Sequence, residues 1–161
     1  MKTNARQQNV VWKVGVWMIA VLAFTVTLPA PAAAALGGDT GSIQADQIHM
    51  KGGLRVTRAQ AFSVHAIQVP SGTVVREFVS PAGKVFAVAW QGPSLPDLRQ
   101  LLGSYFEQFQ QAAQTNRRGH GPLIIEQPGL VVQSGGHMRS FVGRAYIPDM
   151  VPEGVRLEEI R

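Results

Sequence analysis

The 161-residue chain contains no cysteine. This absence excludes disulfide bonds and thiol redox chemistry. It also excludes a lipoprotein anchor, which requires a cysteine directly after the cleavage site. The stability of the folded protein must therefore come from side-chain packing and hydrogen bonds alone.

A hydrophobic run long enough to form a membrane-spanning helix is also missing. Residues 14–28 form an apolar stretch of fifteen residues, and prolines at positions 29 and 31 stop its continuation. A spanning helix requires about 18 apolar residues or more. Basic residues precede this stretch and small residues follow it, which is the pattern of a cleavable signal peptide. The pattern disfavours the alternative, a retained membrane anchor.

The small residues Ala33 and Ala35 supply the −3 and −1 positions that a signal peptidase requires. We therefore expect residues 1–35 to be a signal peptide that is cut between Ala35 and Leu36. The protein is then exported through the inner membrane, to the periplasm or the medium, and keeps no stable membrane anchor. Removal of 35 residues from 161 leaves 126, a length typical of a single domain.

Outside the expected signal peptide, residues 1–35, the chain has only a small excess of positive charge. Three of the fifteen Lys and Arg residues lie in residues 1–35, together with none of the ten Asp and Glu residues, so the remainder has a net charge of +2. Proteins that bind nucleic acid usually concentrate many cations on one surface. We therefore expect no nucleic-acid partner.

Motifs for metal binding and nucleophilic catalysis are missing as well. The four histidines, His49, His65, His120 and His137, do not form the HxH, HxxxH or HExxH spacing that places two imidazoles on one metal. No serine lies in a GxSxG turn, which exposes a nucleophile. The sequence therefore predicts no metal site, no cofactor and no assigned catalytic residue.

Acidic residues offer little more. Glu77, Asp97 and Glu126 could in principle meet as an acid and base pair. However, Asp97 is placed to cap a helix, and Glu77 follows Arg76. We therefore expect these carboxylates at the surface.

The first half of the chain carries a pattern of strands. Residues 36–60 are polar and rich in glycine, and we expect a flexible segment with a possible short helix at 43–50. Three runs of β-branched and aromatic residues follow at 61–69, 73–80 and 84–90, and the tripeptides Pro-Ser-Gly and Pro-Ala-Gly separate them. Proline and glycine preset the backbone angles of tight turns, so the pattern predicts an antiparallel meander.

The third run, residues 85–90, is apolar at every position, which indicates a central strand covered on both faces. Alternation assigns Phe86, Val88 and Trp90 to a face of large residues. It assigns Val85, Ala87 and Ala89, with the smaller side chains, to a shallow face on which a helix could lie.

Residues 95–114 show the clearest helical pattern. Apolar residues recur at spacings of three and four, which produces one apolar stripe. Ser94 and Asp97 have the spacing of a capping box. We expect this helix to pack on one face of the sheet.

Two further strand-like runs, residues 123–133 and 137–147, are joined by Ser134, Gly135 and Gly136. Pro128 and Gly129 interrupt the first run, and a bulge or a sheet edge is expected there. Residues 61–161 therefore form a single α+β domain, in which an antiparallel sheet of about five strands, a meander plus a C-terminal hairpin, packs on one long amphipathic helix.

Two loops are candidates for binding. The first consists of Ser134, Gly135, Gly136 and His137, which combine a hydroxyl group, flexible amides and an imidazole; a simple hairpin loop is the competing interpretation. The second contains the basic residues Arg117, Arg118 and His120, which could contact an anion.

Three strings of residues resemble a secreted proteobacterial family known as domain of unknown function 2844. They are residues 70–93, residues 95–106 (LPDLRQLLGSYF) and residues 133–139 (QSGGHMR), and the resemblance extends over about residues 35–147. It implies a short exported protein. It implies no activity, cofactor or catalytic residue.

Three classes of function therefore remain open. The residues favour a non-catalytic envelope protein that binds a ligand or another envelope protein, because turn formers and core formers dominate the sequence and no reactive pair is evident. A hydrolase or transferase with a site near Ser134 and His137 is the second class. A structural or assembly accessory of an exported complex is the third.

Overall fold

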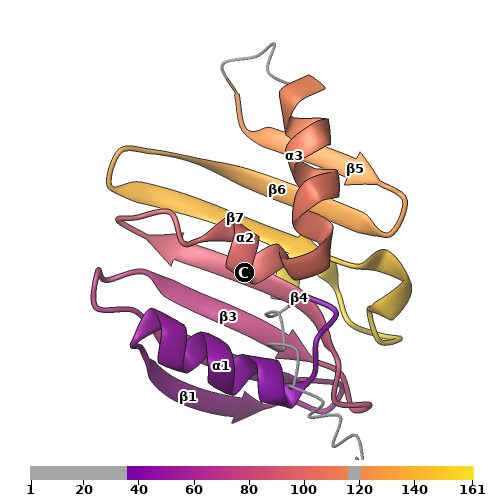
Figure 1. The fold of residues 1–161 in the computed structure, drawn as a ribbon. Coiled ribbons are helices and arrows are strands. Elements are labelled where there is room, and N and C mark those ends of the chain that lie inside the picture. The colour runs from indigo at the N-terminus through magenta and orange to yellow at the C-terminus, as the bar shows by residue number, and fades with distance from the viewer. Residues whose placement is uncertain (1–35, 116–120) are drawn as a thin grey trace, which may run out of the picture.

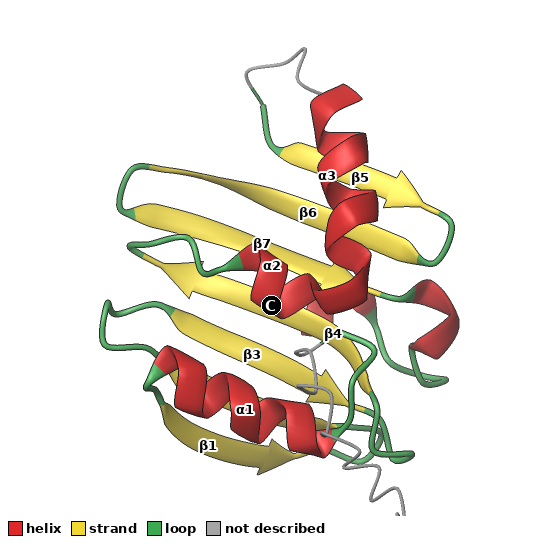
Figure 2. Cartoon of the chain, in the orientation of Figure 1, coloured by secondary structure: helices red, strands yellow, loops and turns green. Residues whose placement is uncertain are grey.

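The computed structural model describes residues 36–115 and 121–161. Its centre is a seven-stranded sheet in the order β1-β2-β3-β4-β7-β6-β5, in which every neighbouring pair is antiparallel (Figure 1). The helices α1 (Thr40–Met50), α2 (Leu98–Leu102) and α3 (Phe106–Thr115) lie across one face of this sheet (Figure 2). The predicted α+β class with an antiparallel sheet is therefore confirmed. The strands are β1 (Gly53–Arg58), β2 (Ser63–Gln68), β3 (Val74–Val79), β4 (Val85–Gly92), β5 (Leu123–Gln127), β6 (Leu130–His137) and β7 (Ser140–Tyr146).

The predicted number of strands, about five, is wrong for two reasons. β1 lies within residues 36–60, where a flexible segment was expected, and it pairs with β2 along its whole length. In addition, Pro128 and Gly129 form a turn between two strands rather than a bulge within one. Gly129 has a φ of +74°, and the flanking residues Gln127 and Leu130 are paired. A proline followed by a left-handed glycine thus reverses the chain.

The last hairpin also differs from the prediction. Ser134, Gly135 and Gly136 were expected to form the loop, but all three lie inside β6 and pair with residues of β7. The hairpin turn is formed instead by Met138 and Arg139, because His137 pairs with Ser140. Arg139 has a φ of +68°. Strand pairing over this stretch therefore overrides the preference of glycine for turns.

β4 is the central strand, and all residues from Val85 to Trp90 are buried. The pairing with β3 shifts by one residue, because Phe78 faces Ala87 and Val79 faces Val85. Phe86 is thus the extra residue of a β-bulge, which places Phe86 and Ala87 on the same side. The predicted faces of β4 are therefore wrong for two residues. Phe86 lies on the same face as Ala87 and Ala89, and Val85 lies on the same face as Val88 and Trp90.

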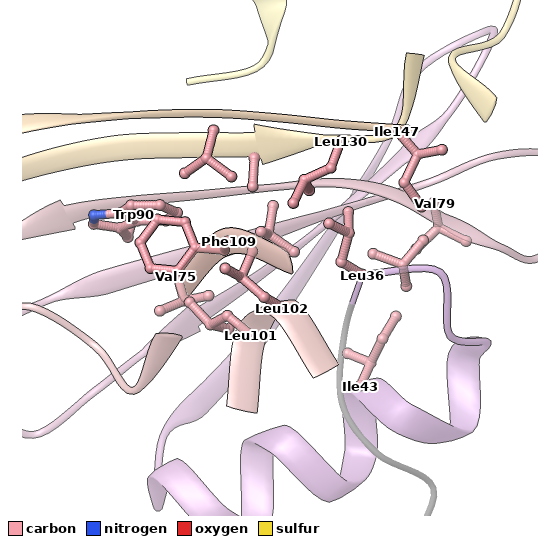
Figure 3. Packing of buried hydrophobic residues seen from close by; sticks show 14 of the residues in the cluster. Leu36, Ile43, Val75, Val79, Trp90, Leu101, Leu102, Phe109, Leu130 and Ile147 are labelled. Carbon is pink, nitrogen blue, oxygen red and sulfur yellow. The ribbon is translucent and has the colours of Figure 1, made fainter. Parts of the chain in front are cut away.

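The helical face carries the main core. Val85, Val88 and Trp90 belong to this cluster together with residues of the helices. Figure 3 shows Trp90 in the same cluster as Ile43, Leu101 and Phe109. Phe86, Ala87 and Ala89 belong to a second, smaller cluster on the opposite face. The shallow side of β4, where a helix was expected, is therefore the side without a helix.

The helices are α1 (Thr40–Met50), α2 (Leu98–Leu102), a 3₁₀ turn η1 (Gly103–Tyr105) and α3 (Phe106–Thr115). The predicted helix over residues 95–114 thus begins at Leu98 and contains a 3₁₀ turn, where Gly103 has a φ of +51°. Asp97 is itself the N-cap, since its carboxylate accepts hydrogen bonds from the amides of Arg99 and Gln100. Ser94 instead hydrogen-bonds to Thr73 and Ser71, so the predicted capping box does not form.

Leu36, the first described residue, is part of the main core. Its side chain is 3% exposed, and its backbone amide donates to the carbonyl of Leu101 over 3.1 Å. In the described ranges, 36–115 and 121–161, no helix is long and apolar enough to cross a membrane.

Candidate functional site

The sheet face opposite the helices, called here the helix-free face, carries a row of arginines. The strand register pairs Arg55 with Ala66, Ala66 with Arg76, Arg76 with Ala89 and Ala89 with Arg144. Residues directly opposite each other on neighbouring strands point to the same side of a sheet. Three guanidinium groups thus alternate with two alanines across five strands, and we call this set the arginine row.

The C-terminal segment, which consists of residues 147–161, covers one end of this row. After β7 the chain forms two 3₁₀ turns, η2 (Pro148–Met150) and η3 (Leu157–Glu159), and the fully buried Ile160 joins the second core cluster. The Arg144 guanidinium donates to the carbonyls of Leu157 and Ile160, and its Nε donates to Oε1 of Gln133 over 2.9 Å. These acceptors are all neutral, so Arg144 holds the segment in place without neutralising its own charge.

The segment divides the helix-free face into two open pockets. The first, called the β6 pocket, has a volume of about 460 Å³ and lies between the segment and β5. Ser134, Gly135 and Gly136 line it, together with Ile124 and Val142, which are each 52% exposed. Three of the four residues of the predicted glycine loop therefore do lie at a pocket, although they reach it from within a strand.

The second pocket, called the Arg76 pocket, has a volume of about 650 Å³ and lies between the segment and β1. Its apolar wall contains Val64, Ala66 and Phe78, and Val142 is shared with the β6 pocket. Both volumes are within the range of about 300–1,000 Å³ that is usual for small-molecule sites. Polar groups also line the Arg76 pocket, namely Thr57, Arg76, Gln91, Glu159 and Arg161.

Arg76 is the most unusual residue of this pocket. Its Nη1 is buried and has no hydrogen-bond acceptor among the described residues. A buried donor without an acceptor is costly, and the cost is greater for a charged group. The only side-chain carboxylate that lines the Arg76 pocket in the described part of the chain is Glu159, whose Oε1 accepts a hydrogen bond from Arg156 Nε over 2.9 Å. Two arginines, Arg76 and Arg161, line the same pocket.

The remaining predicted binding residues are not brought together. His137 is exposed at the end of β6, and its Nδ1 lies 3.2 Å from the carbonyl oxygen of Met138 rather than near Ser134. It does not line the pocket that Ser134 lines. Arg117, Arg118 and His120 lie outside the described residues, as does Ala35 on one side of the expected cleavage site.

A buried pair of carboxyl groups lies on the helical side of the sheet. Glu77 of β3 is fully buried and Asp46 of α1 is 2% exposed, so the expectation that Glu77 is a surface charge is wrong. Burial, reinforced by the neighbouring Asp46, raises the pKa of Glu77 to about 9. Neither oxygen of Glu77 accepts a hydrogen bond in the described residues, and Gln100 Nε2 donates to Asp46 Oδ1 over 2.7 Å. Glu77 is therefore protonated at neutral pH and can act as a donor to Asp46.

His65 is the cross-strand neighbour of Glu77 on β2. Burial and the nearby Arg58 lower the pKa of His65, and its Nε2 lies 3.3 Å from the Ser63 hydroxyl group. No group of three His, Asp or Glu residues in the described ranges is arranged to hold a metal ion. Glu77 is fully buried, whereas His65 is half-buried, and neither lines the β6 pocket or the Arg76 pocket.

The sequence analysis did not predict the burial of Glu77 or the position of Arg76 in a pocket. In the run Val74-Val75-Arg76-Glu77-Phe78-Val79, Glu77 alternates with Val75 and Val79, a signal that it points into the core. Arg76 then points to the other side, opposite Ala89. The signal for the arginine row was the set of alanines on β4, which leave room for arginine side chains rather than for a helix.

No curated protein and no solved structure shows detectable similarity to this chain. A family profile described as protein of unknown function (DUF2844) matches residues 32–160, which confirms the resemblance seen in the sequence. The chain therefore belongs to the DUF2844 family.

Proposed function

We propose that this protein is an exported, non-catalytic binding module that holds an amphiphilic small molecule on its helix-free face. The observation that carries this proposal is the pair of open pockets beside the C-terminal segment. They share the exposed apolar residue Val142, and arginines lie at their borders. Concave apolar surfaces with a few polar groups are the usual form of small-molecule sites.

Export is supported by the leader pattern of residues 1–35. The alternative of a hydrolase or transferase at Ser134 and His137 gains no support from geometry, since the imidazole faces a backbone carbonyl.

The test uses the exported protein and the uncharged apolar dye N-phenyl-1-naphthylamine, whose fluorescence increases in apolar surroundings. Val142 is half exposed, so Val142→Gln should leave the fold intact and weaken dye binding at least tenfold. Ile48→Gln is the matched control, because Ile48 is 76% exposed on α1, on the other side of the sheet. Saturable binding that is lost only in Val142→Gln supports the proposal, and equal binding by both variants overturns it.

A second candidate is an assembly accessory that pairs with another envelope protein along β1. β1 is one edge of the sheet, and all of its residues except Leu54 are exposed. Free strand edges can accept a strand from a partner. A photo-crosslinker at Val56, which is 45% exposed, should then capture the same single protein in repeated experiments. Capture that is equally frequent from Ile48 would overturn this second candidate.

A further inference from the structure

We propose that Arg76 binds the anionic end group, a carboxylate or a phosphate, of the amphiphile that occupies the Arg76 pocket. This inference rests on the proposed function and names the chemistry of its ligand. It assigns the charged end to the arginine row and the apolar body to the wall of the pocket.

The electrostatics of the pocket favour an anion. Arg76 lies two strands from Arg55 and two strands from Arg144. Its backbone is therefore about 9.5 Å from the backbone of each, which is twice the spacing between neighbouring strands. Only Ala66 and Ala89 lie between these residues. Arg76 therefore sits between two further cations, and Glu159, the only side-chain carboxylate that lines the pocket in the described residues, is already bound to Arg156.

The hydrogen-bonding state of Arg76 points the same way. Its buried Nη1 has no acceptor in the described part of the chain. Arg76 lines the pocket, so an anionic oxygen there would pair with its guanidinium group, and such charge-assisted hydrogen bonds are stronger than neutral ones. The planar guanidinium also suits carboxylate and phosphate groups, which can accept two parallel hydrogen bonds.

The wall of the pocket indicates that the ligand is more than a simple anion. Val64, Ala66, Phe78 and Val142 provide an apolar surface next to the guanidinium. Phe78 is only 2% exposed, so it forms the floor of the pocket and offers no open ring on which a base could stack. An aliphatic chain with an anionic end matches both parts of the pocket.

The experiment measures the binding of dodecanoate below its micelle concentration by titration with fluorescence of Trp90. Trp90 belongs to the strand that forms the floor of the Arg76 pocket, its indole packs on the helical side, and it is the only tryptophan after residue 35, so calorimetric titration serves as a second readout. Dodecanol serves as the uncharged probe and acetate as the anion without a chain. We expect dodecanoate to bind at least tenfold more tightly than either, and Arg76→Gln to remove this advantage. Arg76→Lys should restore part of it.

The matched control is a pair of substitutions on one strand. Arg55 lies on the helix-free face, whereas Arg58 lies three residues further along β1 and points to the other side. Arg55→Gln should weaken dodecanoate binding, and Arg58→Gln should leave it unchanged. Thermal unfolding of each variant verifies that the fold is kept.

Each result decides between the claims. Equal affinity for dodecanoate and dodecanol, or affinity for dodecanoate that survives Arg76→Gln, overturns the role of Arg76 and leaves the proposed function standing. Binding of neither probe, together with no dye binding, overturns both. Tighter binding to vesicles of anionic phospholipid than to free dodecanoate, lost in Arg76→Gln, identifies a lipid headgroup as the source of the anion. Binding of acetate alone as tightly as dodecanoate contradicts the amphiphile.

Discussion

Replacement of Glu77 by glutamine should stabilise the protein, and more so at higher pH. Glu77 is fully buried beside Asp46, and its pKa rises from 4.5 to about 9 on folding. Below pH 4.5 the carboxyl is protonated in both the unfolded and the folded chain, so its titration costs nothing. Between pH 4.5 and about 9 the unfolded chain releases this proton and the folded chain retains it. Folding therefore becomes less favourable as the pH rises through this window.

The magnitude follows from the shift. Each pH unit within the window lowers the free energy of unfolding by about 1.4 kcal/mol. At pH 7.5, three units above the unfolded value, the cost reaches at most about 4 kcal/mol. Glutamine has a similar shape, does not titrate, and its amide can donate to Asp46. We expect Glu77→Gln to be about 2–4 kcal/mol more stable than the wild type at pH 7.5 and about equally stable at pH 4.5.

The assay is unfolding by urea, followed by the fluorescence of Trp90 at intervals between pH 4.5 and 8.5. Linear extrapolation provides the free energy of unfolding at each pH. His65, whose pKa is lowered by burial and by Arg58, adds a dependence of opposite sign below pH 6.5. This contribution is present in both proteins and disappears in the difference between their curves.

Glu126→Gln is the control, because Glu126 is an exposed residue of β5. Its curve should run parallel to that of the wild type. If the curve of Glu77→Gln also runs parallel to the wild type from pH 5 to 8.5, Glu77 does not carry a retained proton and the reasoning is refuted.

Three further predictions concern packing and capping. Gly143→Ala should destabilise the fold by about 1–3 kcal/mol, because the added Cβ would lie 2.3 Å from Cζ2 of Trp90 and 2.8 Å from the carbonyl oxygen of Gln133; a lower urea midpoint tests this. Asp97→Ala should cost about 1 kcal/mol through loss of the α2 cap, and Asp97→Asn should restore most of it in the same assay. Ile160→Asp should release the C-terminal segment, because Ile160 is fully buried in the second cluster. We expect faster hydrogen exchange at the backbone amides of Val155 and of residue 160, and unchanged exchange at these amides would contradict the prediction.

The meander and the long helix were predictable because their signals are local. The turns before β3 and β4 each contain a glycine with positive φ, Gly72 and Gly83, and the apolar stripe of residues 98–115 specifies its own buried face. The fold class follows from these elements alone. Ser134, Gly135 and Gly136, which the sequence offered as candidate binding residues, line the β6 pocket, and their role in binding stays a prediction.

The missed features depend on neighbours that are distant in the sequence. β1 reads as a polar segment because its side chains are mostly exposed, and only its pairing with β2 makes it a strand. The bulge at Phe86 depends on the register with β3, and this register decides which side of β4 faces the helices. The burial of Glu77 depends on Asp46 and Gln100, which come from two helices. The pairing that creates the arginine row likewise appears only when five strands are aligned.

The position of β7 has a consequence for how the chain is assembled. β7 follows the other six described strands in the chain, yet it lies between β4 and β6 and joins the meander to the β5–β6 hairpin. Until residue 146 has emerged, one edge of β4 lacks its partner, although six consecutive residues of that strand are apolar and destined for the core. Exposed apolar edges of this kind promote aggregation of incomplete chains. A protein that crosses a membrane unfolded from its N-terminus would therefore depend on late residues, or on a chaperone, to protect its most hydrophobic strand.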